Sequence, residues 1–280
     1  MSSEAMDMEA MPTTRAEREA YAEAGYLVRE RVFSASELEG LIADLEDVCG
    51  RVREEGARLS ADFRSGGGNA APHLPELGVQ AIWESDLEVV KLIEPVMHFS
   101  ERLQALWEHP VLVELARIAV GAGEVGPATD KFNTKRRRSG SRFPWHQDYL
   151  YWYPFLRQQA RDLCTVMIFL DDATEANGAM VVVPGTQTGP LPRRRDAEVV
   201  IQRLEIDESR LDTSQETVVE VGAGGVLVFG SLLLHRSGPN TTDADRRALL
   251  LTYQPAGRPR IDSEAYKAAI DAERWFDELP

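Results

Sequence analysis

The chain has 280 residues, of which 43% are hydrophobic and 28% charged, a composition that is ordinary for a soluble globular enzyme. Its formal net charge of -15 argues against nucleic acid or an anionic membrane surface as the main partner, because both require a basic footprint. We predict a cytoplasmic protein: no apolar run reaches the roughly 18 residues of a membrane span, two cysteines fit a reducing compartment, and the acidic start lacks a secretory pattern.

The first elements in chain order are predicted to be helical. Residues 1–14 are polar and Met-rich and are expected to be disordered, so a single domain is expected over residues 15–280. A helix is expected from Arg15 to about Gly25, followed by a short strand at 26–28. A second helix begins at Ser34, where a glutamate three residues later completes a capping box.

The next segments predict a loop and a further helix. Residues 60–75 contain three consecutive glycines and no hydrophobic period, which predicts a mobile loop and a candidate lid over the site. A helical pattern then runs from about Pro95 through Ile118.

The second half of the chain changes to short apolar runs separated by turn residues. Several short strands without intervening helices favour an antiparallel jelly-roll barrel, with the helical N-terminal half packed on one sheet. The segment from Ser263 to Leu279 has a helical composition. The expected strands are 165–170, 180–183, 217–221, 226–229 (within an apolar strand that continues to 234) and 248–253.

Three residues have the types and spacing of a metal site. One residue separates His146 from Asp148, so on a strand their side chains would point to the same side. His235 follows the apolar run 226–234 and can supply a second imidazole from a distant strand. Two histidines and one carboxylate occupy one face of an octahedral metal, which is the ligand set of non-haem iron(II) oxygenases.

Arg246 lies eleven residues after His235, beyond a turn. Two strands that pair through this turn would bring both residues into one cavity. A 2-oxoglutarate molecule that chelates iron(II) has a distal carboxylate, which needs a buried cation as its partner. The planar fork of Arg246 suits that carboxylate.

Three motifs together resemble the phytanoyl-CoA dioxygenase family. They are Pro144–Asp148, the segment 177–186 that begins Asn-Gly-Ala-Met and ends Pro-Gly-Thr, and His235 through Arg246. The resemblance covers most of residues 15–255 and implies a double-stranded β-helix that uses iron(II), 2-oxoglutarate and dioxygen. It also implies that the two histidines and the aspartate bind the metal.

The resemblance implies roles for three further residues. Arg246 matches the 2-oxoglutarate anchor, and Ser237 matches a small polar residue that assists it. Lys135 falls near a basic position before the first metal ligand. The expected reaction is oxidation of a C–H bond, most simply hydroxylation, in a small carbon-rich molecule such as a natural-product intermediate.

The substrate-contacting residues are harder to assign. An aromatic patch follows the motif at residues 149–155, and core packing and a substrate pocket explain it about equally well. Tyr149, Tyr151 and Trp152 are its candidate pocket residues, together with His73 in the expected lid.

Other chemistries stay open or are disfavoured. A zinc hydrolase that uses the same three ligands is the main enzymatic alternative, and a non-catalytic metal-binding sensor on the same barrel is another. Halogenation is disfavoured because Asp148 fills the position that a halide would need. The oligomeric state does not follow from the sequence.

Overall fold

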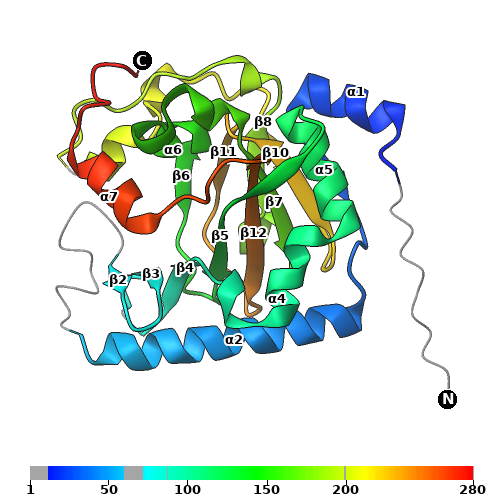
Figure 1. The fold of residues 1–280 in the computed structure, drawn as a ribbon, viewed down its shortest axis with the longest axis vertical. Helices are drawn as coiled ribbons and strands as arrows, with labels where there is room; N and C mark the ends of the chain where they lie inside the picture. The colour runs from blue at the N-terminus through cyan, green and yellow to red at the C-terminus, as the bar shows by residue number, and fades with distance from the viewer. Residues whose placement is uncertain (1–11, 60–71, 87, 199, 280) are drawn as a thin grey trace.

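Two antiparallel β-sheets that face each other form the centre of the molecule (Figure 1). The structure is a computed structural model, and it describes residues 12–59, 72–86, 88–198 and 200–279. The larger sheet has the strand order β1-β10-β7-β12-β5-β4-β3-β2, and the smaller sheet has the order β6-β11-β8-β9. This arrangement confirms the predicted jelly-roll class with mainly antiparallel strands and added helices.

The elements have the following bounds. The larger sheet contains β1 (Tyr26–Arg29), β2 (His73–Leu74), β3 (Val79–Trp83), β4 (Val90–Glu94), β5 (Val125–Lys135), β7 (Cys164–Phe169), β10 (Val226–Gly230) and β12 (Arg246–Pro255). The smaller sheet contains β6 (Phe143–His146), β8 (Met180–Val183), β9 (Thr217–Val219) and β11 (Leu234–Ser237). The α-helices are α1 (Arg15–Ala24), α2 (Ala35–Ala57), α4 (Glu101–Ala105), α5 (Pro110–Val120), α6 (Asp148–Leu156) and α7 (Ser263–Asp271). Short 3-10 segments are Met97–Phe99, Leu106–Glu108, Arg157–Asp162, Glu175–Asn177, Thr186–Thr188, Val200–Leu204 and Glu208–Arg210.

The two N-terminal helices begin with capping boxes. In α2 the Glu37 backbone N–H donates to Ser34 Oγ, and the Ser34 N–H donates to the Glu37 carboxylate at 2.8 Å. Thr14 and Glu17 make the same reciprocal pair at α1. Each box satisfies backbone donors that would otherwise lack a partner at the first turn. The predicted start of α2 is therefore confirmed.

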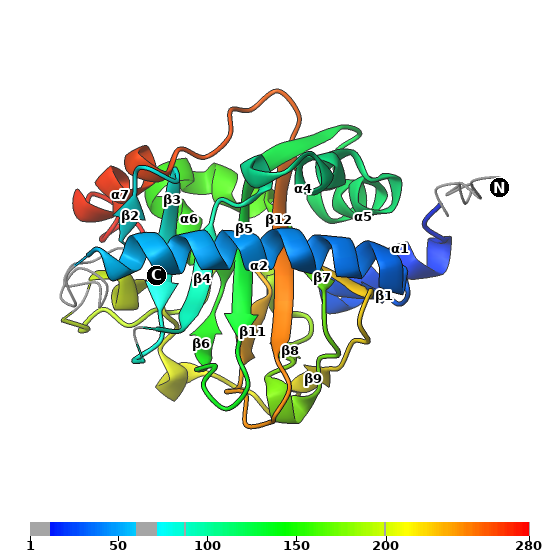
Figure 2. The ribbon, with the colours of Figure 1, turned by 90° about the horizontal axis from the view of Figure 1, so that it is seen from below.

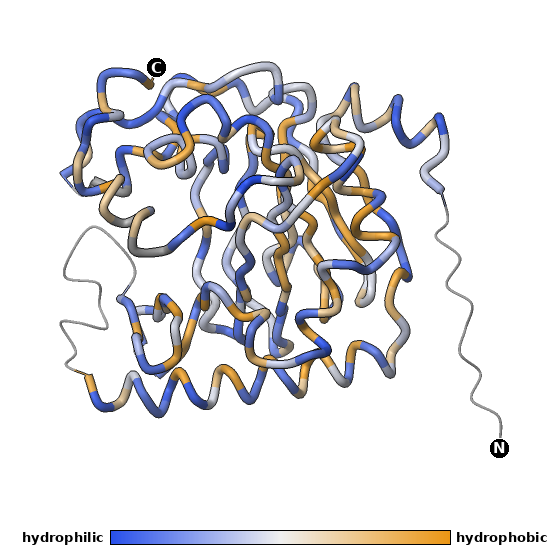
Figure 3. The backbone as a smooth tube through the Cα atoms, in the orientation of Figure 1, coloured by the Kyte–Doolittle hydropathy of each residue, from blue (hydrophilic) through white to orange (hydrophobic). Residues whose placement is uncertain are grey.

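Helix α2 covers the outer face of the larger sheet, and Figure 2 shows it crossing β4, β5, β12 and β7. Hydrophilic and hydrophobic positions alternate along α2 in Figure 3, as expected for a helix with one buried face. That face carries Leu41, Leu45 and Val48, which pack in one cluster with Leu249 and Leu251 of β12. Helix α5 adds Leu112, Leu115 and Ala116 to this cluster.

The opposite face of the larger sheet looks into the space between the two sheets. Side chains alternate along a strand, so Ala248 and Leu250 of β12 point away from the helices and pack with Met180 and Val182 of β8. Strand β7 adds Met167 and Phe169 to this interior cluster. The inward-facing positions of both sheets are therefore the positions that can build a shared site.

The run predicted as one strand at 226–234 is two strands, so that prediction was wrong. Strand β10 pairs with β1 and β7 of the larger sheet, whereas β11 pairs with β6 and β8 of the smaller one. A turn at Gly230 joins them, and the Leu233 N–H donates to the Gly230 carbonyl at 3.0 Å. A continuous apolar run fits a buried strand in either sheet, so its periodicity does not reveal the crossing.

Other boundaries in the first half also differ from the prediction. The helix expected over 95–118 is broken, because Pro110 lacks an N–H and begins α5 instead of continuing a helix. Strands β2 to β5 extend the larger sheet and were not predicted as strands. Within the expected loop 60–75, His73–Leu74 form β2, and residues 60–71, which carry most of the lid hypothesis, lie outside the described residues.

The C-terminal helix is shorter than predicted. The predicted C-terminal helix ends at Asp271 instead of Leu279. Within the described segments, no helix combines the length and the apolar character needed to cross a membrane.

Candidate active site

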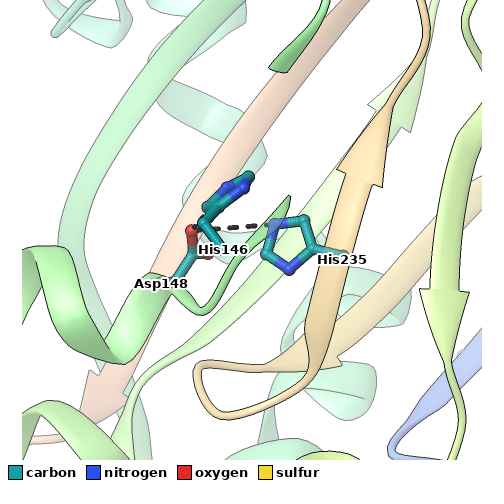
Figure 4. Close-up of side chains that lie close together, drawn as sticks. All are labelled: His146, Asp148 and His235. Atoms are coloured by element: carbon teal, nitrogen blue, oxygen red, sulfur yellow. Dashed lines mark ion pairs between the residues drawn. The ribbon is translucent and has the colours of Figure 1, made fainter. Parts of the chain in front are cut away.

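Two sheet positions and one helix start bring the three predicted ligands together. His146 ends β6, His235 lies in β11 directly opposite it, and Asp148 begins α6. One ligand atom from each residue lies within 4.8 Å of the others. Figure 4 shows the three side chains converging; Asp148 Oδ1 is 3.7 Å from His146 Nε2 and 3.8 Å from His235 Nε2.

Asp148 was predicted to lie on a strand, but it lies at the start of a helix. The strand ends at His146, and Gln147 turns the chain into α6. The buried Gln147 side chain fixes this junction: its Nε2 donates to the Leu232 and Gly189 carbonyls, and its Oε1 accepts from the Leu191 N–H at 2.8 Å. The spacing of one residue was therefore informative, but the geometry that makes it work is a strand-to-helix turn.

Both imidazoles are oriented by the same local hydrogen bond. His146 Nδ1 lies 2.8 Å from the Pro144 carbonyl oxygen, and His235 Nδ1 lies 2.9 Å from the Leu233 carbonyl oxygen. A carbonyl oxygen only accepts, so each Nδ1 carries the proton and each Nε2 presents a lone pair. Such an outer bond is the usual way in which a metal-binding histidine is held in place.

The carboxylate is held by a residue of the larger sheet. Thr165 Oγ on β7 donates to Asp148 Oδ2 at 3.0 Å, which leaves Oδ1 directed at the two imidazoles. Burial alone would raise the pKa of Asp148, but the nearby His235, His146 and Lys131 outweigh it and lower that pKa. Asp148 is therefore ionised at neutral pH.

Burial shifts the pKa of the neighbouring His146 in the opposite direction, because the charged form of an imidazole is the protonated one. It lowers the pKa of His146 to about 3, with a smaller contribution from the nearby His235. His146 is therefore neutral at neutral pH. A neutral imidazole and an ionised carboxylate are the protonation states in which these side chains bind a metal, and the two-nitrogen, one-oxygen donor set fits iron(II).

Two cations lie side by side on the inner face of the larger sheet. Arg246 begins β12 directly opposite Lys135, the last residue of β5, and both are almost fully buried. Arg246 donates to the Gly178 carbonyl, while its Nε has no hydrogen-bond partner among the described residues. Lys135 Nζ donates to the carbonyls of Ser141 and Gly238, each at 2.6 Å.

These two cations carry the electrostatic signature of a site for an anion. Burial lowers the pKa of Arg246 to about 10, and burial with the adjacent Arg246 lowers the pKa of Lys135 to about 6. Neither donates a hydrogen bond to a carboxylate within the described part of the chain. A buried cation without an anionic partner is costly, so a bound carboxylate would stabilise the charged Arg246 and favour protonation of Lys135.

The predicted pairing of the strands that carry His235 and Arg246 was wrong. Strand β11 belongs to the smaller sheet and β12 to the larger one, so the two residues face each other across the interior. The connection between them crosses between the sheets, and Asn240 Nδ2 holds it by donating to the Lys135 and Ala244 carbonyls at 2.8 Å each. Ser237 lies two residues beyond His235 and therefore on the same face of β11.

The aromatic patch divides between the site and the core. The Tyr151 ring lies 5.5 Å from the His146 ring, and Trp152 lies 5.2 Å from Tyr266 of α7. The buried Tyr149 instead packs on Tyr153 and donates to Gln158. His73 lies in β2 at the edge of the larger sheet, on a different element from any of the three clustered ligands.

The chain has two runs of basic residues, 135–138 and 193–195, and several of their side chains make internal contacts. Arg136 pairs with Glu46 and Asp245, and Arg138 pairs with Asp243. In the second run, the Arg193 guanidinium lies 4.4 Å from the Phe276 ring centroid.

Sequence reasoning missed two residues that shape this site. Thr165 is a polar residue at the start of an otherwise apolar strand, and that contrast was a usable signal. Lys131 on β5 acts electrostatically on both His146 and Asp148, but a lone lysine in a strand gives no comparable signal.

Comparison with known proteins assigns the family. The phytanoyl-CoA dioxygenase (PhyH) family matches residues 21–248. An L-proline trans-4-hydroxylase from Streptomyces griseoviridis is 29% identical over 190 residues, which cover 62% of this chain and 70% of the relative. An ectoine dioxygenase from Bordetella parapertussis is 25% identical over 287 residues, with 93% of this chain and 85% of the relative covered.

Solved structures show the same fold at lower identity. The ectoine enzyme EctD from S. alaskensis, crystallised with 2-oxoglutarate and 5-hydroxyectoine, has a TM-score of 0.64 at 21% identity and covers 89% of this chain and 79% of its own. The alpha-ketoglutarate-dependent carbocyclase SnoK from nogalamycin biosynthesis has a TM-score of 0.63 at 20% identity, covering 96% and 94%. With the family matched over most of its length, this chain belongs to the phytanoyl-CoA dioxygenase family of non-haem iron(II), 2-oxoglutarate-dependent dioxygenases.

Proposed function

We propose that His146, Asp148 and His235 bind iron(II), and that the enzyme oxidises a C–H bond of a small molecule. The observation that carries the proposal is the hydrogen bonding of the two imidazoles. Each Nδ1–H is taken by a backbone carbonyl, so both Nε2 atoms and Asp148 Oδ1 are directed at one point. When bound there, iron(II) with 2-oxoglutarate and dioxygen supplies the oxidant, and 2-oxoglutarate is converted to succinate and carbon dioxide.

We propose that Arg246 binds the distal carboxylate of 2-oxoglutarate. Its buried guanidinium has an unpartnered Nε, and its fork can form two parallel hydrogen bonds to a carboxylate. Lys135 lies beside it in register, and Ser237 faces the same interior from the other sheet. These two residues are proposed to assist the anchor.

The protein's own groups position the reactants and exclude water. Thr165 holds Asp148 so that one oxygen is free for the metal, and the Tyr151 ring covers one side of His146. Aromatic rings beside such a site contact the carbon skeleton of a substrate. Tyr151 and Trp152 are therefore retained as proposed substrate contacts, whereas the contacts of Tyr149 support core packing.

The reaction proposed for this chain is hydroxylation of a small metabolite, in a single domain formed by residues 15–280 and located in the cytoplasm. Support comes from the relatives, whose names give L-proline and ectoine as substrates and nogalamycin biosynthesis as a pathway. The sensor and the zinc hydrolase, which the sequence left open, have no specific observation in their favour.

The test measures metal binding and turnover together. The purified protein should bind one iron(II) per chain, and iron(II), 2-oxoglutarate and dioxygen should together yield succinate when a substrate is supplied. A metal-dependent hydrolase would show no dependence on 2-oxoglutarate. A sensor would bind metal and 2-oxoglutarate but release no succinate with any member of a substrate library.

A further inference from the structure

A third cation, Lys131, lies on the inner face of the larger sheet. In β5 it is four residues before Lys135, an even number, so both side chains leave the strand on the same side. Its register partner on β12 is Leu250, which packs in the interior cluster between the sheets. Lys131 therefore faces the compartment that contains the metal ligands.

The Lys131 ammonium has incomplete partners. It forms a long ion pair with Glu94, whose Oε2 is 3.9 Å away and thus beyond hydrogen-bond distance, and the Trp152 ring centroid is 5.1 Å away. The other oxygen of Glu94 accepts a hydrogen bond from Thr129 Oγ at 2.9 Å, which holds that carboxylate in place. Across the described residues, no hydrogen bond from the Lys131 ammonium is formed.

The Lys131 side chain is sheltered but open to a ligand. It is 20% exposed, compared with 16% for Asp148 and 14% for His146. A cation that is four-fifths buried loses much of its hydration, and an anion that accepts its hydrogen bonds would compensate for that loss. Lys131 is therefore about as accessible to a ligand as His146 and Asp148 are.

Lys131 and the metal ligands share one electrostatic environment. It contributes to lowering the pKa values of both Asp148 and His146. The Trp152 ring near the Lys131 ammonium lies on α6, four residues after Asp148, and packs on Tyr266. The aromatic residues of α6 thus extend from Tyr151, near His146, to Trp152, near the Lys131 ammonium.

We propose that Lys131 binds an anionic oxygen group of the primary substrate, so that the substrate is a small organic acid with a carbon skeleton against Trp152. The inference rests on the proposed function and adds the substrate class to it. The position is distinct from the 2-oxoglutarate anchor: four residues of strand place Lys135 about 13 Å from Lys131 along β5, at about 3.3 Å per residue. Arg246 would thus bind 2-oxoglutarate, and Lys131 would bind the primary substrate.

The experiment measures the binding of small carboxylic acids, each compared with its own carboxamide. Suitable pairs are L-proline with L-prolinamide and benzoate with benzamide, measured by saturation-transfer NMR and calorimetry. The protein carries zinc(II) in place of iron(II), to prevent turnover, and saturating 2-oxoglutarate, to fill the Arg246 position. We expect one or more acids to bind the wild-type protein more tightly than their carboxamides.

Two substitutions then assign the effect to the residue. Lys131→Met removes the charge at similar length and should weaken acid binding by about tenfold or more, because a charge-assisted hydrogen bond is lost. Lys131→Arg should retain most of it. Lys91→Met is the matched control: the Lys91 ammonium already donates to Ser141 Oγ at 2.8 Å and to the Arg142 carbonyl at 3.1 Å, so acid binding should not change.

Three results would overturn the inference: acids that bind no better than their carboxamides, a panel in which no acid binds, or full acid binding in Lys131→Met. Calorimetry of 2-oxoglutarate on the same samples separates this failure from a failure of the proposed function. If 2-oxoglutarate binds the metal-loaded protein and no acid does, only the role of Lys131 is wrong. If 2-oxoglutarate itself does not bind, the oxygenase assignment fails and the inference fails with it.

Discussion

Replacing Arg246 by alanine should strongly weaken the binding of 2-oxoglutarate. Arg246 is 2% exposed, and although its Nη2 donates to the Gly178 carbonyl, its Nε has no partner among the described residues, so a bound carboxylate could accept hydrogen bonds from it. Truncating one partner of a buried, hydrogen-bonded charge pair typically costs about 2–5 kcal/mol. Since about 1.4 kcal/mol corresponds to tenfold, the Kd for 2-oxoglutarate should rise about 30-fold or more.

The assay is calorimetric titration of 2-oxoglutarate into the metal-loaded protein without oxygen. Arg246→Lys keeps a charge but loses the planar fork, so its Kd should lie between those of the wild type and Arg246→Ala. Arg138→Ala is the control, because its exposed pair with Asp243 is on the surface and contributes little. Metal affinity should stay unchanged, because Arg246 is not a ligand. An unchanged 2-oxoglutarate affinity in Arg246→Ala would refute the anchor assignment.

Three further predictions concern a proposed metal ligand, the hydroxyl that holds Asp148, and the buried Lys135. His235→Ala should lose most of its iron(II) affinity in an equilibrium dialysis assay, and full retention would contradict its role as a ligand. Thr165→Val removes the hydroxyl that donates to Asp148, so metal affinity should fall by about 10- to 100-fold, as for other outer partners of metal ligands; a smaller change would mean that Asp148 is positioned by other groups. Burial lowers the pKa of Lys135 from 10.5 to about 6, so between these values the unfolded chain binds more protons than the folded one, and the free energy of unfolding should rise with pH. Lys135→Met should lose this part of the pH dependence in denaturant titrations without ligand, and an unaltered slope would show that the folded protein keeps Lys135 charged.

The sequence alone was sufficient for features that depend on nearby residues. The capping box at Ser34 and Glu37 involves groups three residues apart, so its hydrogen bonds form wherever the helix packs. Strand β8 was predicted with its observed ends at Met180 and Val183, because turn residues bound it on both sides. The side chains proposed to bind the metal, His146, Asp148 and His235, were also evident, since a metal site needs particular side chains at particular spacings.

The sequence did not determine which strands pair. An apolar run predicts burial but not a partner, so the crossing at Gly230 from one sheet to the other was not foreseen. The same limitation applies to Arg246, which was placed on a strand next to His235 but lies on the opposite sheet. Hydrogen-bond partners in a sheet are distant in sequence, and they are selected by the packing of both faces together.

The basic run at 135–138 shows most directly what tertiary structure decides. Its four residues are similar in sequence, but alternation along β5 sends Lys135 into the interior, whereas Arg136 pairs with Glu46 on α2. Lys131 was overlooked for the same reason, because a single lysine on a strand becomes a candidate binding residue only when the sheet turns it toward the interior between the two sheets. The sequence determined which chemical groups are present, and the pairing of the two sheets decided which of them meet, because side-chain direction depends on register and on the face that each strand buries.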